Sequence, residues 1–283
     1  MPYNTPPDEE TPLLSTPQPR ARLPISRWRK HLTADVSRDG ADCILILCYL
    51  ITGLLDSASI SVWGSFVSMQ TGNTVYVGLG LASPSSSTRW IKSGTSLVAF
   101  CAGSFLFSRF HRRFSPKRRW VLAASFAAQA ALTAAAAGLV TAPAATPLGK
   151  NDDDSQGGSA SVVFGGGGGV SWRVLAPIGL VALQSCGQAV ASRALRYNAL
   201  TSVVLTSIYC DLFSDADLFA VRNPARNRRT AAPLLLLLGA FLGGKLAAGP
   251  WGVAGALWTA SALKAALVFV WLIWPADGSV EAS

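Results

Sequence analysis

Residues Gly53 to Leu81 read GLLDSASISVWGSFVSMQTGNTVYVGLGL, and this stretch decides the fold. It lies inside an apolar run from Cys43 to Ala82 in which Asp56 is the one charged residue. Forty residues with a single charge do not form a water-facing surface, and they exceed the roughly 20 residues that one membrane-crossing helix needs. The run is therefore predicted to cross a membrane and then either return across it or dip back in.

A polar patch, Gln70-Thr71-Gly72-Asn73-Thr74, interrupts the second half of this run. Backbone and amide groups inside a membrane need hydrogen-bond partners, so such a patch is tolerated only where it faces protein or a water-filled cavity. We therefore expect Asp56 and this patch to face the same internal site.

The amino-acid composition is that of a membrane protein. Of its 283 residues, 50% are hydrophobic and only 14% are charged, compared with about a quarter charged in soluble domains. Long apolar segments recur, so we predict an all-α, multi-pass integral membrane protein whose main partner is the lipid bilayer. The net charge of +9 comes from basic residues beside the apolar segments, where they set orientation, and we expect no nucleic-acid partner.

No motif of catalysis or metal binding stands out. The five cysteines lie in apolar segments without a C-x-x-C pair, which is typical of buried small hydrophobic residues. His31 and His111 both lie among basic residues, and the five glycines at Gly165 to Gly169 lack the Lys-Ser/Thr ending of a phosphate loop. We expect no catalytic residues, no metal site, no cofactor and no enzyme activity.

The chain divides into a tail, one membrane domain and a short end. Residues 1–40 are Pro-rich and polar, which predicts a disordered cytoplasmic tail. We expect residues 41–274 to form a single helical transmembrane domain with a flexible loop at 143–171, and residues 275–283 to form a short C-terminal tail.

The tail contains a short acidic dileucine pattern. Glu9 stands four residues before Leu13 and Leu14, an arrangement that vesicle coat adaptors read. The pattern therefore predicts a location in a vacuolar or endosomal membrane. If the pattern is accidental, the plasma membrane is the alternative location.

Hydropathy marks eight apolar segments, at 43–62, 65–82, 92–110, 120–142, 172–192, 199–213, 231–249 and 251–274. The tail carries six Lys/Arg residues, which favours a cytoplasmic N-terminus, and the link 109–119 carries another six. Eight crossings place that link outside, whereas six crossings, with 65–82 and 199–213 dipping in and returning, place it inside. The positive-inside rule favours six.

A faint internal repeat supports broken segments. Residues 67–71 align with 202–206, residues 100–103 align with 241–244, and Gly53 falls opposite Gly187. With three crossings in each half, the halves would form a 3+3 inverted repeat with broken or re-entrant segments, as in many secondary transporters.

The pattern G-L-L-D-(x14)-T-G-N-T-V-(x2)-G-L-x-L at Gly53–Leu81 resembles the first signature of the YoaK-type family, domain of unknown function 1275. Gln184 to Arg193 and Leu205-Thr206 resemble its second signature, and the resemblance covers residues 41–274. It implies a multi-pass membrane protein of a family found in bacteria and fungi, and it implies no particular substrate or cofactor. Thr206 is followed here by Ser207 and not by the glycine often seen in the family, which leaves a helix break at this point open.

Several residues are candidates for a polar site near the midplane. They are Asp56, Gln70, Thr71, Gly72 and Asn73, with Gln184, Gln188 and Thr206 as counterparts in the second half. A carboxylate inside a membrane usually lines a pathway or has a partner, and Lys264 is the candidate partner of Asp56. The polar residues could equally be hydrogen-bonding contacts between helices.

The leading functional hypothesis is a secondary transporter or permease that binds a small solute or a proton at these residues. The alternative is a non-catalytic scaffold, assembly factor or lipid-interacting protein. The sequence leaves the oligomeric state open.

Overall fold

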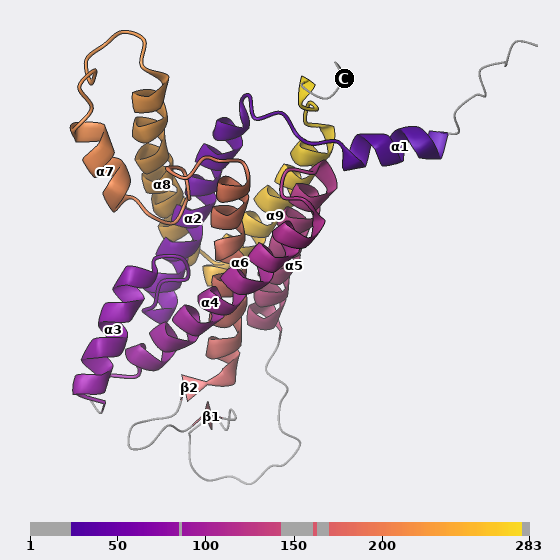
Figure 1. Ribbon diagram of the computed structural model, residues 1–283. Coiled ribbons are helices and arrows are strands. Elements are labelled where there is room, and N and C mark those ends of the chain that lie inside the picture. The colour runs from indigo at the N-terminus through magenta and orange to yellow at the C-terminus, as the bar shows by residue number, and fades with distance from the viewer. Residues whose placement is uncertain (1–23, 85–86, 143–160, 163–169, 279–283) are drawn as a thin grey trace, which may run out of the picture.

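The computed structural model describes residues 24–84, 87–142, 161–162 and 170–278, and these residues fold almost entirely into helices (Figure 1). The elements in chain order are α1 (Pro24–Thr33), α2 (Ala41–Trp63), α3 (Gln70–Ala82), α4 (Arg89–Phe114), α5 (Arg119–Thr141), β1 (Ser161–Val162), β2 (Val170–Ser171), α6 (Trp172–Ala194), α7 (Thr206–Phe213), α8 (Pro224–Ala248) and α9 (Gly252–Ile273). Strands β1 and β2 pair antiparallel, with Val162 opposite Val170. The predicted all-α bundle is confirmed. The sorting residues Glu9, Leu13 and Leu14, and most of the predicted loop 143–171, lie outside the described residues.

Local signals explain where several helices begin and end. Helix α2 stops because Gly64 adopts a left-handed conformation, with φ of 75°, and its N–H bonds back to Ile60 O. Helix α6 begins after Ser171, whose side chain accepts from the N–H of Arg173. Helix α8 begins after Asn223, which caps Arg226 N in the same way, and has a proline in its first turn.

Six of the described helices, α2, α4, α5, α6, α8 and α9, are long and apolar enough to cross a membrane. Helices α3 and α7 have only 13 and 8 residues. At about 1.5 Å per residue they are roughly 20 Å and 12 Å long, well short of a hydrocarbon core of about 30 Å. The chain is therefore a multi-pass integral membrane protein with six helices able to span among the described residues, and the helices within the segments predicted at 65–82 and 199–213 are too short to do so.

The basic link 109–119 lies at the same end of the bundle as the described N-terminal residues and the C-terminal segment. Val36 N donates to Lys117 O at 3.0 Å, and Ser37 N donates to Pro275 O at 2.9 Å. The ends of α4, α6 and α9 and the starts of α2, α5 and α8 gather here (Figure 1). This is the arrangement that six crossings require, and eight crossings would have separated these segments.

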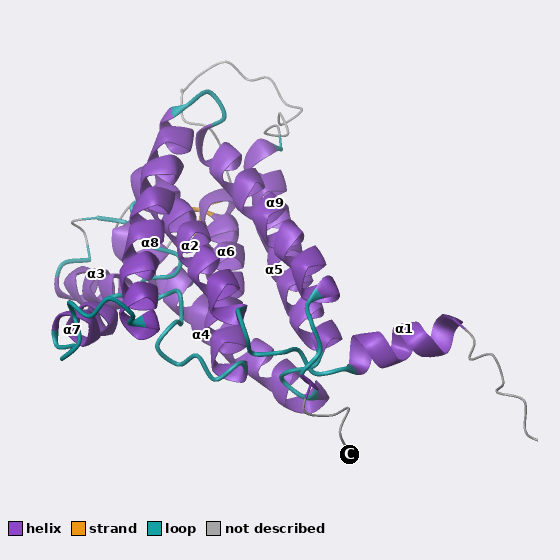
Figure 2. Cartoon of the chain, turned by 90° about the horizontal axis from the view of Figure 1, so that it is seen from above, coloured by secondary structure: helices purple, strands orange, loops and turns teal. Residues whose placement is uncertain are grey.

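Helix α1 corrects part of the predicted disordered tail. Residues 24–33 are helical and project sideways from this end of the bundle, across the direction of the long helices (Figures 1 and 2). His31 Nε2 is hydrogen-bonded to Leu272 O at 2.8 Å, and Arg119 donates to His31 O. These bonds to the bundle order a segment whose polar, charged composition alone suggested disorder.

The two halves of the membrane domain repeat one another. Helices α2 to α5 and helices α6 to α9 follow the same plan, in which a long helix, a short helix and two long helices come in turn. Helices α2 and α6 run in opposite directions, because the start of α2 and the end of α6 lie at the same end of the bundle (Figure 1). Helix α2 packs on α8 as α4 packs on α6, and α5 packs on α9 between the halves. The domain is thus an inverted repeat.

Glycines allow these helix pairs to approach backbone to backbone. A Cβ on Gly53 would lie 2.0 Å from Leu236 O, and a Cβ on Gly103 would lie 2.1 Å from Leu183 O. Both glycines therefore sit where no other residue fits without moving a helix, as is common between membrane helices.

Helix α8 places two of its glycines against α2. Gly239 and Gly243 pack closely, since a Cβ on either would come within about 2.2 Å of a carbonyl oxygen of α2. Gly244 has open space around it. Adjacent positions on a helix point in different directions, so Gly243 faces α2 whereas Gly244 does not.

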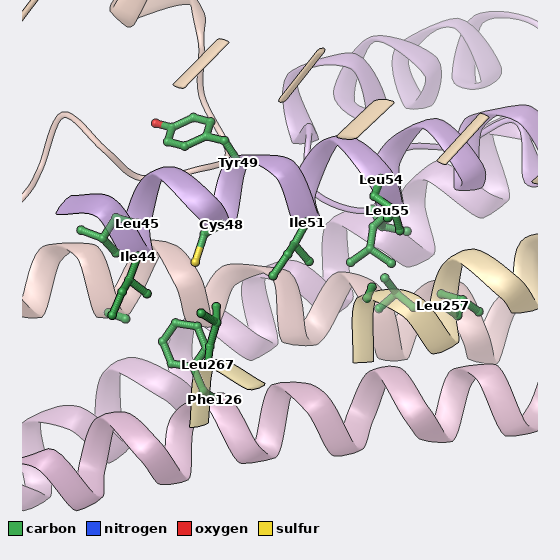
Figure 3. Close-up of a cluster of buried hydrophobic side chains, with 14 of the residues drawn as sticks. Ile44, Leu45, Cys48, Tyr49, Ile51, Leu54, Leu55, Phe126, Leu257 and Leu267 are labelled. Carbon is green, nitrogen blue, oxygen red and sulfur yellow. The ribbon is translucent and has the colours of Figure 1, made fainter. Parts of the chain in front are cut away.

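The apolar core lies between α2, α5, α6 and α9 (Figure 3). Ile44, Cys48 and Ile51 of α2 lie on the side facing Phe126 of α5 and Leu267 of α9, and all five are buried. The cysteines at 48 and 186 are free and buried, as small hydrophobic residues are. This core fixes the long helices, against which the two short helices are placed.

Candidate functional site

A cavity of about 780 Å³, here called the central cavity, lies where the two broken segments meet the long helices. Its volume falls within the range of about 300–1,000 Å³ typical of small-molecule sites. Its polar lining comes from Thr52, Asp56, Ser57, Ser68, Gln70, Thr71, Ser104, Arg193 and Thr206. Its apolar lining includes Ile60, Phe66, Met69, Val75, Phe100, Val190, Val203, Leu205 and Leu236. Both short helices start at this cavity, α3 at Gln70 and α7 at Thr206.

Asp56 lines the cavity, but its carboxylate accepts hydrogen bonds from the connection between α2 and α3. Its Oδ1 accepts from Val67 N at 2.8 Å and from Ser68 N at 2.9 Å, and its Oδ2 accepts from Ser68 Oγ. The side chain is 9% exposed. A carboxylate that takes three hydrogen bonds from one loop holds that loop in place, because the backbone N–H groups there have no other partner at this depth.

The side-chain amide of Asn73 also makes its hydrogen bonds within the connection between α2 and α3. Its Oδ1 accepts from Ser65 Oγ at 3.2 Å and from Phe66 N at 3.1 Å. Its Nδ2 lies within hydrogen-bonding distance of Phe66 O, Gln70 Oε1 and Ser96 Oγ, at 2.8 to 3.1 Å. The side chain is completely buried and does not line the central cavity. The predicted role of Asn73 in a solute site is therefore corrected to a role in holding the break.

The remaining predicted residues of the first half do reach the cavity. Gln70 lines it while its Nε2 donates to Val67 O and to Ser96 Oγ, both at 3.2 Å. Thr71 and Gly72 line it as well, and Thr71 is exposed. The first turn of α3 is thus the part of the polar patch that a solute could touch.

Of the residues predicted for the site in the second half, Thr206 lines the central cavity and the two glutamines do not. Thr206 lines the cavity at the start of α7, so the helix does break here although no glycine follows. Gln184 and Gln188 are buried inside the bundle and do not line it. Neither amide atom of Gln184 has a hydrogen-bond partner among the described residues.

Lys264 does not pair with Asp56. Its side chain is completely buried, and its Nζ donates to Gln129 Oε1 at 2.7 Å. With the Gln188 amide oriented so that its oxygen faces Lys264, that oxygen accepts from Nζ at 2.6 Å. The ion pairs among the described residues are Arg228–Asp42 and Arg229–Asp215. The predicted pair is corrected because Lys264 faces α5 and α6, whereas Asp56 faces the loop after α2.

The Gln188 amide links this lysine to the second break and to the cavity wall. In the same orientation its nitrogen donates to Ser202 Oγ at 2.9 Å and to Thr52 Oγ1 at 3.2 Å. Ser202 lies in the connection between α6 and α7, and Thr52 lines the central cavity. Gln188 therefore holds the second break, as Asp56 holds the first.

Sequence reasoning missed several lining residues. Ser57, Ser68 and Arg193 stand within the stretches that resemble the family signatures, so their position was a usable signal. Thr52 and Ser104 gave no signal, because serine and threonine are common in membrane helices as packing residues. Among the described residues, no group of three His, Cys, Asp or Glu side chains lies close enough to hold a metal ion.

Comparison with known proteins gives a family. The model of the family described as "Protein of unknown function (DUF1275)" matches residues 44–270, which is most of the chain and includes both broken segments. No curated protein and no solved structure matches the chain. The protein therefore belongs to the DUF1275 family, the YoaK-type family of multi-pass membrane proteins.

Proposed function

We propose that this protein is a secondary transporter or permease that binds a small solute in the central cavity. The observation that carries the proposal is that both halves of an inverted repeat break at this one cavity, α3 at Gln70 and α7 at Thr206. Many transporters build their site this way, because unwound backbone and helix starts near the midplane supply polar groups that a continuous helix hides.

The lining sets the kind of solute. Much of the wall is apolar, and Arg193 adds one exposed guanidinium group. Hydroxyl and amide groups form a minority, from Thr52, Ser104, Thr71, Thr206 and Gln70. Such a wall suits a small organic solute with an apolar body and few hydrogen-bonding groups. We assign Asp56 to holding the loop, because its carboxylate already has three donors, so a proton carrier at this residue is not part of the proposal.

Orientation is part of the same proposal. We place the end that carries α1 and the basic link 109–119 in the cytoplasm, because basic residues gather on the cytoplasmic side of membrane proteins. Ser115→Cys in a background without the five native cysteines tests this in sealed cells. Labelling by an impermeant maleimide only after permeabilisation is expected, and labelling of intact cells would reverse the orientation.

Ligand discovery comes first in the functional test. A solute library is screened for an increase in the unfolding temperature of the purified protein, because a ligand at about 100 times its dissociation constant stabilises the folded state by about 2.7 kcal/mol. Hits are then tested for saturable uptake into proteoliposomes, with and without an imposed proton gradient.

Cavity-filling variants show whether the flux uses this cavity. Thr71→Trp and Thr206→Trp place a large side chain at exposed lining positions and are expected to abolish uptake while leaving the unfolding temperature of the unliganded protein nearly unchanged. Leu79→Trp is the matched control, since Leu79 is an exposed residue of α3 away from this cavity. Flux that survives both cavity variants, or flux that Leu79→Trp also removes, contradicts the proposal.

A further inference from the structure

We propose that a second hollow, at the end of the bundle that carries α1, binds a phosphate group. The hollow has a volume of about 280 Å³ and lies between the last turns of α4 and α6. It is lined by Ser108, His111, Arg112, Pro116, Val190, Arg193 and Ala194. The proposal is independent of the transport function, although Arg193 borders both this hollow and the central cavity.

His111 is the first observation. Its side chain is 2% exposed, and neither ring nitrogen has a hydrogen-bond partner among the described residues. The ring lies against the backbone of Pro116 without a bond of good geometry. A buried imidazole without a partner is costly, so a ligand in the hollow that it lines would satisfy it. A neutral ring offers one N–H donor to such a ligand, and a charged ring offers two.

Two arginines stand at the same hollow with their charges uncompensated. Arg112 donates from Nε to Ser108 O at 3.3 Å, which leaves its terminal amino groups free for a ligand. Arg193 is exposed, and neither arginine belongs to an ion pair among the described residues. Guanidinium groups bind phosphate through paired hydrogen bonds, so two of them beside an unpartnered histidine form a phosphate site and not a cation site.

A simpler role accounts for only part of this arrangement. Basic residues in the last turn of a helix stabilise its negative end, and Arg112 and Arg193 both lie in such turns. That role needs neither burial nor a hollow. It does not explain why His111 is enclosed without a partner.

The surroundings place the hollow at the depth of lipid headgroups. Phe110, Phe114 and Trp120 form an aromatic cluster beside it, with ring centroids 5.1 to 6.0 Å apart. Aromatic clusters of this kind sit at the membrane–water interface, and basic pockets between helices there bind anionic headgroups. The phosphate could therefore belong to a lipid headgroup or to a soluble phosphate compound, and the chemistry of recognition is the same.

The test measures binding to the purified full-length protein by native mass spectrometry and by the shift in unfolding temperature. The probes are phosphatidic acid, phosphatidylcholine and inorganic phosphate, added separately. Wild-type protein is expected to bind phosphatidic acid or inorganic phosphate in preference to phosphatidylcholine. Binding of phosphatidic acid alone identifies a headgroup site, and binding of inorganic phosphate identifies a site open to soluble phosphate. Binding of neither, or equal binding of phosphatidylcholine, overturns the proposal.

Variants then locate the bound phosphate. Arg112→Gln combined with Arg193→Gln is expected to weaken binding by about ten-fold or more, since charge-assisted hydrogen bonds are lost. Arg113→Gln is the matched control, because this exposed arginine is in the same turn of α4 but lies against Phe114 and not in the hollow. Equal weakening in the control would mean that general positive charge attracts the probe, and it would overturn the site.

His111→Phe separates a ligand role from a structural one. It keeps a ring in the buried position and removes both unpartnered nitrogens. The unliganded variant is expected to unfold at the wild-type temperature or higher, while its phosphate binding weakens by about ten-fold. A variant that unfolds earlier and binds phosphate like wild type contradicts the proposal.

Discussion

The two breaks in the inverted repeat are held very differently. The first, at residues 64–69, is tied by Asp56 and Asn73, whose side chains bond to the backbone of Phe66, Val67 and Ser68. The second, at residues 195–205, is held by Gln188, which bonds to Ser202, and by two bonds near its start. There Ser192 Oγ donates to Tyr197 O, and Arg38 donates to Arg196 O. In the register that sets Gly53 opposite Gly187, the position of Asp56 is taken by Val190.

The same plan of helices is thus built with a firm half, around the first break, and a looser half, around the second. Segments with few hydrogen bonds and little buried surface open at lower free energy than their surroundings. Helix α7 has 8 residues, compared with 13 in α3, and it follows the second break. We infer that motion at the central cavity begins at α7, while α3 keeps its place.

Removing the Asp56 carboxylate, which holds the first break, is expected to lower the free energy of unfolding most. Asp56→Ala leaves two backbone N–H groups and the Ser68 hydroxyl without their acceptor. At about 1–3 kcal/mol for each unsatisfied group, the free energy of unfolding is expected to fall by roughly 3 kcal/mol or more, as measured by unfolding in mixed detergent.

Two further variants sharpen this result. Asp56→Asn retains one acceptor oxygen and is expected to lose less stability than Asp56→Ala. Adding Lys264→Met to Asp56→Asn should not restore stability, since Lys264 bonds to Gln129 and Gln188 and not to Asp56. Rescue by Lys264→Met would show that the two charges interact after all.

A pair of neighbouring glycines tests the helix contact that joins the halves. A Cβ on Gly243 would lie 2.2 Å from Leu54 O, whereas one on Gly244 would meet nothing within 4 Å. Gly243→Ala is expected to lower the free energy of unfolding by about 1–3 kcal/mol through overpacking. Gly244→Ala is expected to be neutral or to gain up to about 1 kcal/mol, because alanine favours the helix. Equal losses for the two variants would mean that α2 and α8 are not this close.

A substitution in the second break is expected to lower the free energy of unfolding least. Ser202→Ala removes one hydrogen bond to the Gln188 amide, which has other partners in Thr52 and Lys264. The expected loss is about 1 kcal/mol, measured by the same unfolding assay as for Asp56→Ala. A loss as large as that of Asp56→Ala would remove the distinction between a firm half and a looser half.

Much of the fold could be predicted from sequence because it follows from hydrophobicity and charge. The apolar runs gave the six spans once the basic link 109–119 was required to share a side with the N-terminal region. The polar patch at Gln70–Thr74 marked the start of α3, since polar groups cannot continue unpartnered through a membrane. Helix α1 was not predicted, because contacts with the distant residues Leu272 and Arg119 order it.

The candidate site was predicted only in part, because some of its polar side chains bond to backbone groups whose positions the sequence does not reveal. Asp56 suggested a charged partner such as Lys264, but its actual partners are the N–H groups of Val67 and Ser68, which no residue type reveals. Asn73 reads as a ligand in sequence and is saturated within the fold, while Thr71 and Thr206 do reach the central cavity. Residue type shows that a polar group must be satisfied, but only the fold shows by what.

If the central cavity binds a solute between the two breaks, its wall must be reached by water, and the labelling rate of one cysteine measures this. Thr206→Cys is placed in a background without the five native cysteines and exposed to a membrane-impermeant thiosulfonate in proteoliposomes. Leu237→Cys is the control, because Leu237 is an exposed apolar residue of the candidate span α8 and does not line the central cavity. Thr206→Cys is expected to react at least about ten-fold faster, because the reactive thiolate forms only where water reaches it. A rate no faster than that of Leu237→Cys would mean that the cavity is closed to water, and it would contradict the account.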